Sequence, residues 1–210
     1  MAFEGWGNEA VEFFEQLTAE NTKTFWLAHK PVYEREVLAP MQALLADLAP
    51  EFGPGRLFRP YRDVRFSTDK SPYKTTIAAM VGPTRYVQFS ADGLGAGVGL
   101  YDMSPDQLDR YRRAVDEDRT GKELQRIVAA LARRDATLMS RETLKTAPRG
   151  YAKNHPRIEL LRHKGIGVWR ETDPADWLDS PQAVPVLTGF FRDAKPLEAW
   201  IARNVGTGET

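Results

Sequence analysis

Cysteine is absent from this 210-residue sequence, and no apolar run reaches the roughly 18 residues of a membrane-spanning helix. Without a thiol, the chain cannot hold a disulfide, a thiolate zinc site, a cysteine-ligated iron–sulfur cluster or a cysteine nucleophile. The first ten residues, MAFEGWGNEA, also lack the basic and apolar pattern of a secretion signal. These absences favour a cytoplasmic protein with no membrane partner.

The composition is that of a globular chain. Apolar residues make up 42% and charged residues 28%, near the averages for globular proteins, and the sequence contains no repeat. A chain of this length buries about 70% of its unfolded surface, so it needs neither a disulfide nor a metal to fold. We therefore expect one domain over residues 1–210, with a core over residues 8–203 and a frayed tail over residues 204–210.

The hydrophobic period changes twice along the chain, from helical to strand-like and back to helical. Helices are expected over residues 8–20, 21–48, 105–134, 158–161 and from 180 onward. Strands are expected over residues 63–67, 77–81, 85–91, 94–101 and 165–171. This order predicts an α+β fold, in which a mostly antiparallel or mixed sheet packs with N-terminal, central and C-terminal helices.

Capping residues, glycine and proline predict where the helices begin and break. Asn8 should cap the first helix, because its side chain can accept from an unpaired backbone amide. Pro31 should kink or interrupt the second helix, since proline lacks an amide donor. Thr120-Gly121 should break the central helix, and Pro185 or Pro196 should interrupt the last one.

One predicted strand has a face made of glycine. Residues 94–101 alternate apolar side chains with Gly95, Gly97 and Gly99, so a helix, an aromatic ring or a ligand could lie directly on the sheet. The string GLGAGVG at 93–99 does not complete G-x-G-x-x-G, and it belongs to a predicted hairpin rather than to a strand-to-helix turn. Dinucleotide binding by this strand is therefore not expected.

Positive charge is concentrated in two stretches of an otherwise acidic chain. Residues 56–74 hold six Lys/Arg against two Asp, and residues 141–170 hold eight Lys/Arg against two Glu. The rest of the chain has 15 Lys/Arg and 25 Asp/Glu. We expect the two basic segments to meet in the fold, where they would attract an anion despite the neutral total.

The familiar short motifs are weak in this chain. Two S-x-x-K matches fall in residues 67–74, but they lie in a turn after a predicted strand and lack their partner motifs. The three histidines, His29, His155 and His163, do not have H-E-x-x-H spacing. We expect neither a metal nor a cofactor.

Residues 61–74, YRDVRFSTDKSPYK, gather many groups that are costly to bury unpaired. On a strand, Asp63 and Arg65 would share one face. Arg65 would then form either a buried ion pair or an anion clamp, because a guanidinium fits carboxylate and phosphate equally well. Asp69 could pair with Lys70 or with Lys74 and so close the turn.

Three strings of the sequence resemble one protein family. They are RDVRFSTDKSPYKT, APRGYAKNHPRIELLRHKG and FFEQLTAENTKTFWLAHKPVYEREVLAP. Together they resemble the family called domain of unknown function 2461, over about residues 8–203, with the RF-x-x-DKSPYK box and the PRGY loop as the most specific parts. The resemblance implies a single α+β domain and names no activity, cofactor or catalytic residue.

We expect the two basic segments to form a pocket for a small ligand that bears phosphate or carboxylate. The candidate binding residues are Arg62, Asp63, Arg65, Asp69, Lys70, Tyr73, Lys74, Arg149, Tyr151, His155 and Lys164. If the pocket is catalytic, His155 or His163 would act as acid or base and the arginines would stabilise charge. The sequence decides neither between binding and catalysis nor on an oligomeric state.

Two alternatives stay open. The same segments interleave aromatic residues with cations, which is typical of nucleic-acid binding, although the neutral pI of 6.9 and the acidic remainder disfavour it. In the other alternative the ion pairs lock a corner of the sheet, and function belongs to a surface that binds a protein partner.

Overall fold

The computed structural model describes residues 2–65, 67–172 and 178–206. Six strands form one sheet in the order β1-β2-β3-β4-β6-β5, and helices account for most of the remaining ordered chain. β1 pairs with β2, β2 with β3 and β5 with β6, all antiparallel. The fold is therefore α+β, as the order of sequence periods predicts.

The chain divides into two compact units, and the single domain over residues 1–210 stays a prediction. Unit 1 comprises residues 1–96 and 171–190, and unit 2 comprises residues 97–170 and 191–210. The tail predicted to fray begins inside a helix at Asn204, and residues 207–210 lie outside the described part of the chain. Within that described part, no helix is long and apolar enough to cross a membrane.

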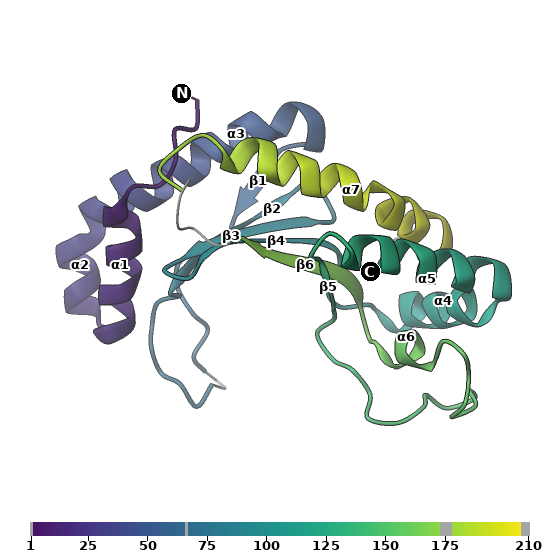
Figure 1. Cartoon of the computed structure of the whole chain (residues 1–210). Helices are drawn as coiled ribbons and strands as arrows, with labels where there is room; N and C mark the ends of the chain where they lie inside the picture. The colour runs from purple at the N-terminus through teal and green to yellow at the C-terminus, as the bar shows by residue number, and fades with distance from the viewer. Residues whose placement is uncertain (1, 66, 173–177, 207–210) are drawn as a thin grey trace. The chain divides into compact units, whose positions relative to one another are not determined.

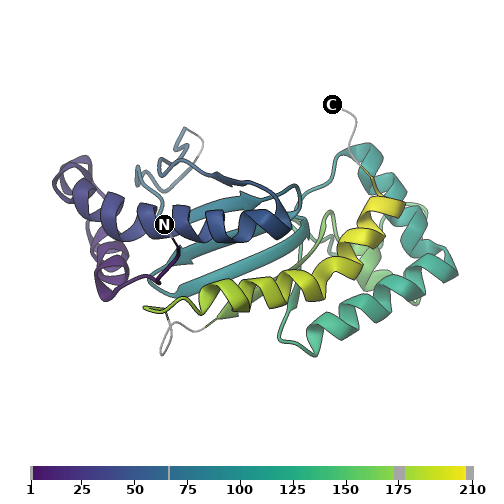
Figure 2. The ribbon, with the colours of Figure 1, turned by 90° about the horizontal axis from the view of Figure 1, so that it is seen from above.

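Unit 1 is built from N-terminal helices and a three-stranded meander. Its elements are α1 (Asn8–Ala19), α2 (Lys23–Val32), the π-helix η1 (Tyr33–Leu38), α3 (Ala39–Phe52), β1 (Gly55–Leu57), β2 (Thr76–Val81), β3 (Arg85–Ser90), the first half of β4 (Gly93–Leu100) and the start of α7 (Ala183–Asn204). α1 and α2 lie side by side (Figure 1), and α3 lies over β1 and β2 (Figure 2). The indole of Trp6 stacks on Phe89 of β3 at 4.4 Å between ring centroids, in the core of this unit.

Unit 2 carries the central helices. Its elements are α4 (Pro105–Asp116), α5 (Asp118–Ala132), β5 (Thr137–Met139), α6 (Ile158–Arg162), most of β6 (Ile166–Thr172) and the rest of β4 and α7. Two buried aromatic side chains place their polar atoms on backbone carbonyls of other elements: Tyr111 Oη donates to Leu160 O at 2.8 Å, and Trp200 Nε1 donates to Thr120 O at 2.9 Å. These bonds let large apolar rings fill the core without an unpaired donor.

The helix boundaries correct several expectations. Gly7, not Asn8, precedes α1, and no side chain caps that helix. Pro31 lies inside α2 and is followed directly by η1, so its missing amide is absorbed by a π-helical segment rather than by a sharp kink. The central break falls at Glu117, whose extended backbone separates α4 from α5, while Thr120-Gly121 lies in the first turn of α5.

The last helix is not interrupted as predicted. α7 runs for 22 residues without interruption. Pro185 lies in its first turn, where an amide donor has no partner within the helix in any case. Pro196 lies inside the helix and does not end it.

Candidate functional site

The eleven residues predicted from the sequence fall into two groups, one in each unit. Arg62, Asp63, Arg65, Asp69, Lys70, Tyr73 and Lys74 belong to unit 1, whereas Arg149, Tyr151, His155 and Lys164 belong to unit 2. Each group lies in its own loop, and their meeting at one pocket stays a prediction.

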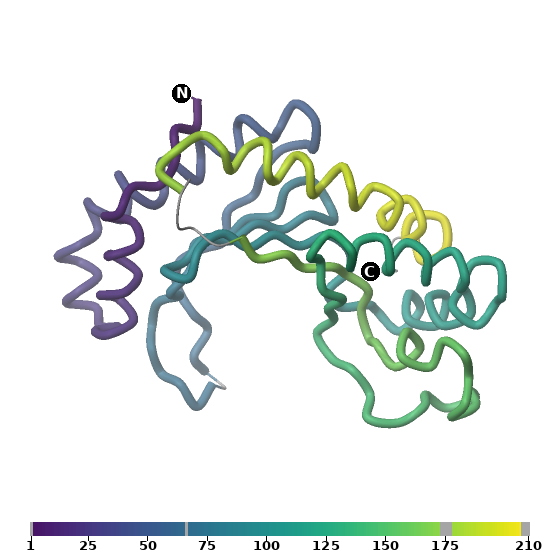
Figure 3. The backbone as a smooth tube through the Cα atoms, in the orientation of Figure 1, coloured from purple at the N-terminus to yellow at the C-terminus, as the bar shows by residue number. Residues whose placement is uncertain are grey.

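The first group lies in the long loop between β1 and β2, which we call the 58–74 loop (Figure 3). Its two ends form a narrow antiparallel neck, in which Tyr61 faces Tyr73. Two backbone hydrogen bonds close the neck: Arg62 N donates to Pro72 O at 2.9 Å, and Lys74 N donates to Pro60 O at 2.8 Å.

The strand expected over residues 63–67 is wrong for the described part of the loop, and Phe66 lies outside that part. Two aspartates accept backbone amides that a strand would need. Asp63 Oδ1 accepts from Arg65 N at 3.3 Å, and Asp69 Oδ1 accepts from Ser71 N at 2.9 Å. Such local side-chain bonds compete with a strand ladder, and alternation of residue types alone does not reveal them.

Two residues of α1–α2 hold the neck in place. Asn21, between the helices, donates from Nδ2 to Tyr73 O and accepts at Oδ1 from Tyr73 N, both at 3.0 Å. The indole of Trp26 stacks on the Tyr73 ring with 4.4 Å between centroids and 8° between planes. Tyr73 is therefore a buried anchor of the loop and not an open phenol ready for a ligand.

Ion pairs neutralise both predicted arginines of the loop. Arg65 Nη2 lies 2.7 Å from Asp63 Oδ2 in a forked pair, with 77% of the arginine side chain exposed, so the pair is neither buried nor free. Arg62 pairs with Asp69. Hydrogen bonds from Ser71 and Arg62 hold the pKa of Asp69 well below its usual range.

The lysine expected to pair with Asp69 does not do so. Lys70 Nζ instead donates to the carbonyl of Val64 at 3.0 Å. The Nζ of Lys74 lies over the Phe58 ring, 5.5 Å from its centroid. The carboxylate of Asp69 thus accepts hydrogen bonds from Ser71 and Arg62. Among the described residues, Lys74 forms no salt bridge with a carboxylate.

Arg59 is the residue of this loop that the sequence analysis missed. Its charge acts on Lys74, and this repulsion adds to burial in lowering the pKa of Lys74. Neither Arg59 nor Lys74 forms a salt bridge in the described part of the chain, whereas Arg62 and Arg65 do. The charge of Arg59 also helps to lower the pKa of Asp63. The signal available in the sequence was the excess of four cations in residues 56–74.

In unit 2, His155 is held by hydrogen bonds at both ring nitrogens. Nδ1 accepts the backbone amide of Arg157 at 3.0 Å, and Nε2 lies 3.1 Å from Asp116 Oδ1. The first bond places the neutral ring's proton on Nε2, where it faces Asp116. His155 therefore has no nitrogen free to act as an acid or base toward a ligand.

Arg157, absent from the candidate residues, is the most buried cation of the basic segment. Its Nε donates to Val115 O at 2.6 Å, and its Nη2 donates to Asp116 O at 2.7 Å and to Asp118 Oδ1 at 2.9 Å. The guanidinium thus covers the last carbonyls of α4 at the point where α5 begins. A cation at this position is favoured by the negative end of the helix dipole. Arg157 belongs to the scaffold and not to a binding surface.

His163 lies in a second polar cluster of unit 2. Its Nδ1 is 2.9 Å from Ser140 Oγ and 3.1 Å from Thr143 Oγ1. Burial lowers the pKa of His163, which keeps the ring neutral near pH 7. The adjacent Lys164 pairs with Glu142 at 2.8 Å, so its charge is compensated within the unit.

The remaining predicted residues of unit 2 lie in the PRGY loop. Arg149 is exposed and has no carboxylate partner in the described ranges. Burial, with a contribution from the charge of Asp116, raises the pKa of Tyr151. Arg112 of α4 also acts on Tyr151, and its buried Nε has no hydrogen-bond partner among the described residues.

The glycine face of β4 is covered by protein atoms. A side chain at Gly97 would meet the indole of Trp169 at 3.1 Å, and one at Gly99 would meet the backbone carbonyl of Ile166 at 2.3 Å. The sequence analysis expected a helix, an aromatic ring or a ligand on this face, and the Trp169 ring lies against Gly97. A ligand therefore has no room against the backbone at Gly97 or Gly99.

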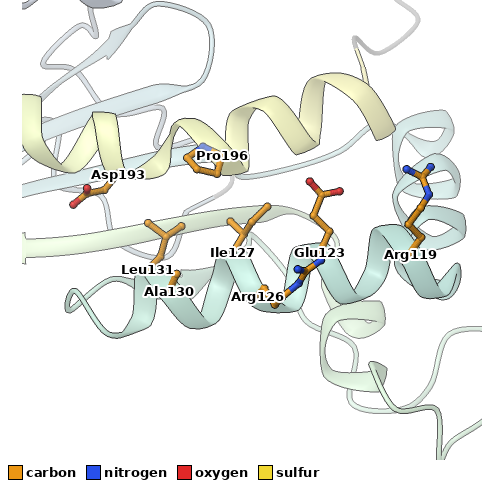
Figure 4. Close-up of a pocket in the computed structure, with 8 residues that line it drawn as sticks. All are labelled: Arg119, Glu123, Arg126, Ile127, Ala130, Leu131, Asp193 and Pro196. Atoms are coloured by element: carbon orange, nitrogen blue, oxygen red, sulfur yellow. The ribbon is translucent and has the colours of Figure 1, made fainter.

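A shallow pocket of about 410 Å³ lies between α5 and α7 in unit 2 (Figure 4). None of the eleven predicted residues lines it. Its floor is apolar, and its two carboxylates are engaged: Glu123 pairs with Arg203 at 2.6 Å, and Asp193 pairs with Arg134.

The comparison with protein families supports the family expected from the sequence. Residues 9–200 match the family described as conserved hypothetical protein (DUF2461). The chain belongs to this family. The match to DUF2461 includes both basic segments, 56–74 and 141–170. No curated protein and no solved structure matches the chain.

Proposed function

We propose that the protein binds a small phosphate- or carboxylate-bearing ligand at the neck of the 58–74 loop, through Arg59 and Lys74. The observation that carries this proposal is that Arg59 and Lys74, two cations of one loop, form no salt bridge among the described residues. Lys74 is partly buried and feels the charge of Arg59, while no carboxylate lies within salt-bridge distance of either in the described ranges.

The charge of Arg59 adds to burial in raising the cost of charging Lys74. A bound anion would offset that cost and accept hydrogen bonds from both side chains. The neighbouring Arg62 and Arg65 show the opposite arrangement, since each already has an aspartate. A lysine such as Lys74, whose pKa is lowered and which has no salt bridge among the described residues, is more typical of a binding site than of a structural ion pair.

The neck is built to hold these cations before a ligand arrives. Asn21 binds both backbone polar groups of Tyr73, and the Trp26 indole stacks on the Tyr73 ring. Lys74 follows Tyr73 directly and is bonded through its amide to Pro60. Such preorganisation reduces the entropy lost on binding.

The charge of unit 1 favours a small ligand over a polyanion. This unit contains 10 Lys/Arg and 16 Asp/Glu, a formal charge of −6, so a nucleic acid would be repelled beyond the loop itself. A small anion would feel mainly the two nearest cations, because salt screens charges over about 10 Å. Catalysis is not part of the proposal, since both nitrogens of His155 are engaged.

A thermal melt against phosphate, pyrophosphate, sugar phosphates, nucleotides, dicarboxylates and a short oligonucleotide tests the proposal. A ligand at 100 times its Kd should stabilise the protein by about 2.7 kcal/mol, or about 5–11 °C for a chain of this size. Lys74→Met should abolish the shift. Arg65→Ala, which removes an exposed and already paired cation from the same loop, should leave it unchanged.

A shift of equal size in wild type, Lys74→Met and Arg59→Met would place the ligand elsewhere and refute the proposal. No shift with any compound would also count against it. As an independent readout, the pKa of Lys74 measured by NMR should rise when the anion binds, because the anion favours the charged ammonium.

A further inference from the structure

We infer that the shallow pocket between α5 and α7 binds a small amphipathic acid, a molecule with an apolar chain and one carboxylate. All the residues that line this pocket belong to unit 2, so the inference does not rest on the anion site proposed for unit 1. Three features that meet at the pocket carry it: an apolar floor, an ion pair at each end, and an arginine without a carboxylate on the rim.

Two ion pairs join α5 to α7 at the two ends of the pocket. At one end, Glu123 of α5 pairs with Arg203 of α7. At the other end, Asp193 of α7 pairs with Arg134, which lies two residues beyond α5. Residue numbers therefore rise along α5 as they fall along α7, so the two helices run antiparallel with the pocket between the two pairs.

Short side chains leave the space between the helices open. Figure 4 shows Ile127 and Leu131 of α5 pointing toward Pro196 of α7. Ala130 and Pro196 are exposed, and neither side chain is long enough to fill the space. The pocket of about 410 Å³ has room for about a dozen non-hydrogen atoms, at the ~30 Å³ that one water molecule takes in the liquid. This volume is that of a small-molecule site.

The rim of the pocket has more positive charge than its carboxylates neutralise. Arg126 lines the pocket and forms no salt bridge in the described ranges, and its Nε donates to the carbonyl of Lys122 at 3.3 Å. Arg119 also lines the pocket, but its pair with Glu117 is long, at 3.6 Å, and the arginine side chain is 82% exposed, so this pair is weak in water. The rim therefore favours an anion, because both carboxylates that line it already have an arginine.

The charge and the apolar floor lie on one face of α5. Arg126 precedes Ala130 by one helical turn, which places the two residues side by side at the mouth of the pocket. A carboxylate at the mouth can accept from Arg126 while its chain covers Ile127 and Leu131. A small acid with an apolar chain uses both parts of the site, whereas an inorganic anion would leave the floor in water.

Calorimetric titration with three probes tests the inference: decanoate, hexanoate and decylammonium, which has a chain of the same length and the opposite charge. Each methylene removed from water adds about 4-fold in affinity. Decanoate should therefore bind at least about 10-fold more tightly than the shorter hexanoate, even if half of the added chain stays in water. Decylammonium should bind more weakly than decanoate, because the rim repels it.

Two pairs of variants place the ligand. Ala130→Trp fills the mouth and should abolish decanoate binding, whereas Ala129→Trp should bind as wild type, because Ala129 is exposed on the same helix and does not line the pocket. Arg126→Met should weaken decanoate binding by about 10-fold. Arg133→Met is its control, since Arg133 is an exposed cation that follows α5 and lies outside the lining, and it should leave the affinity unchanged.

Absence of decanoate binding to the wild type, or equal binding to the wild type and Ala130→Trp, would overturn the inference. Equal affinities for decanoate and decylammonium would overturn the preference for an acid. Lys74→Met separates this site from the neck of the 58–74 loop, because it should bind decanoate as wild type does. Decanoate binding that is lost in Lys74→Met and kept in Ala130→Trp would support the anion site of unit 1 and overturn the pocket.

Discussion

Replacing Arg157 by alanine should strongly destabilise the protein, although this arginine lies in a basic loop whose other cations are exposed. Its side chain is 3% exposed and donates to two carbonyls at the end of α4 and to the carboxylate of Asp118. The substitution removes all three hydrogen bonds, so the carbonyls of Val115 and Asp116 lose the donor that Arg157 supplies. Asp118 is itself largely exposed, so its loss of a partner adds little.

The size of the effect follows from the two carbonyl bonds. Hydrogen bonds to a charged group contribute about 1.5–3 kcal/mol each, so the free energy of unfolding should fall by about 3–6 kcal/mol. For a chain of this length that corresponds to a fall in Tm of about 6–24 °C. No pH dependence is expected from this contact, because arginine stays charged throughout the accessible range.

Equilibrium urea unfolding followed by circular dichroism measures the loss. Arg149→Ala is the control, since Arg149 lies in the same loop but is exposed and unpaired in the described ranges, and it should change stability by less than about 0.5 kcal/mol. A loss below about 1 kcal/mol for Arg157→Ala, or equal losses for the two variants, would refute the assignment of Arg157 to the scaffold.

Three further predictions test the local structure. Asn21→Ala should cost about 1–3 kcal/mol and speed limited proteolysis within the 58–74 loop, because both backbone groups of buried Tyr73 lose their partner; unchanged cleavage would contradict the role given to Asn21. Gly99→Ala should destabilise more than Gly97→Ala in the same urea assay, because a side chain at Gly99 meets backbone at 2.3 Å and has φ +131°, whereas one at Gly97 meets a ring at 3.1 Å that can shift. Burial lowers the pKa of His163, so the unfolded chain binds a proton at this residue more readily than the folded protein. The free energy of unfolding should therefore fall as the pH is lowered through 6.5, and His163→Asn should flatten this dependence. An identical pH profile in the variant would contradict this prediction.

Much of the fold was predictable because it depends on local patterns. Strands β2, β3, β4 and β6 lie within a residue or two of the ranges expected from alternation, and the hairpin at Asp92-Gly93 joins β3 to β4 as expected. β1 and β5 were missed because three residues are too few to show a period. Because β1 was missed, the sheet was expected to begin at residue 63. In the structure Asp63 accepts the backbone amide of Arg65 at that point instead of joining a strand.

The candidate site was predictable as a composition and not as an arrangement. The basic segment 56–74 contains the cations that the proposal uses. Arg62 and Arg65, which the sequence analysis selected as ligand-binding residues, instead form ion pairs with aspartates. Arg59, flanked by Phe58 and Pro60, has no local signal that sets it apart. Which cation is left uncompensated depends on where each carboxylate lies in space.

The sequence by itself determined the α+β class, the order of most helices and strands, the family and the two concentrations of positive charge, because each of these follows from near neighbours along the chain. The tertiary structure decided the rest. It alone places Asn21 on Tyr73, 52 residues away, and Arg157 on the end of α4, 41 residues away. Burial depends on groups that are distant in sequence and adjacent in space, so Arg157 becomes part of the scaffold although the other cations of its loop are exposed.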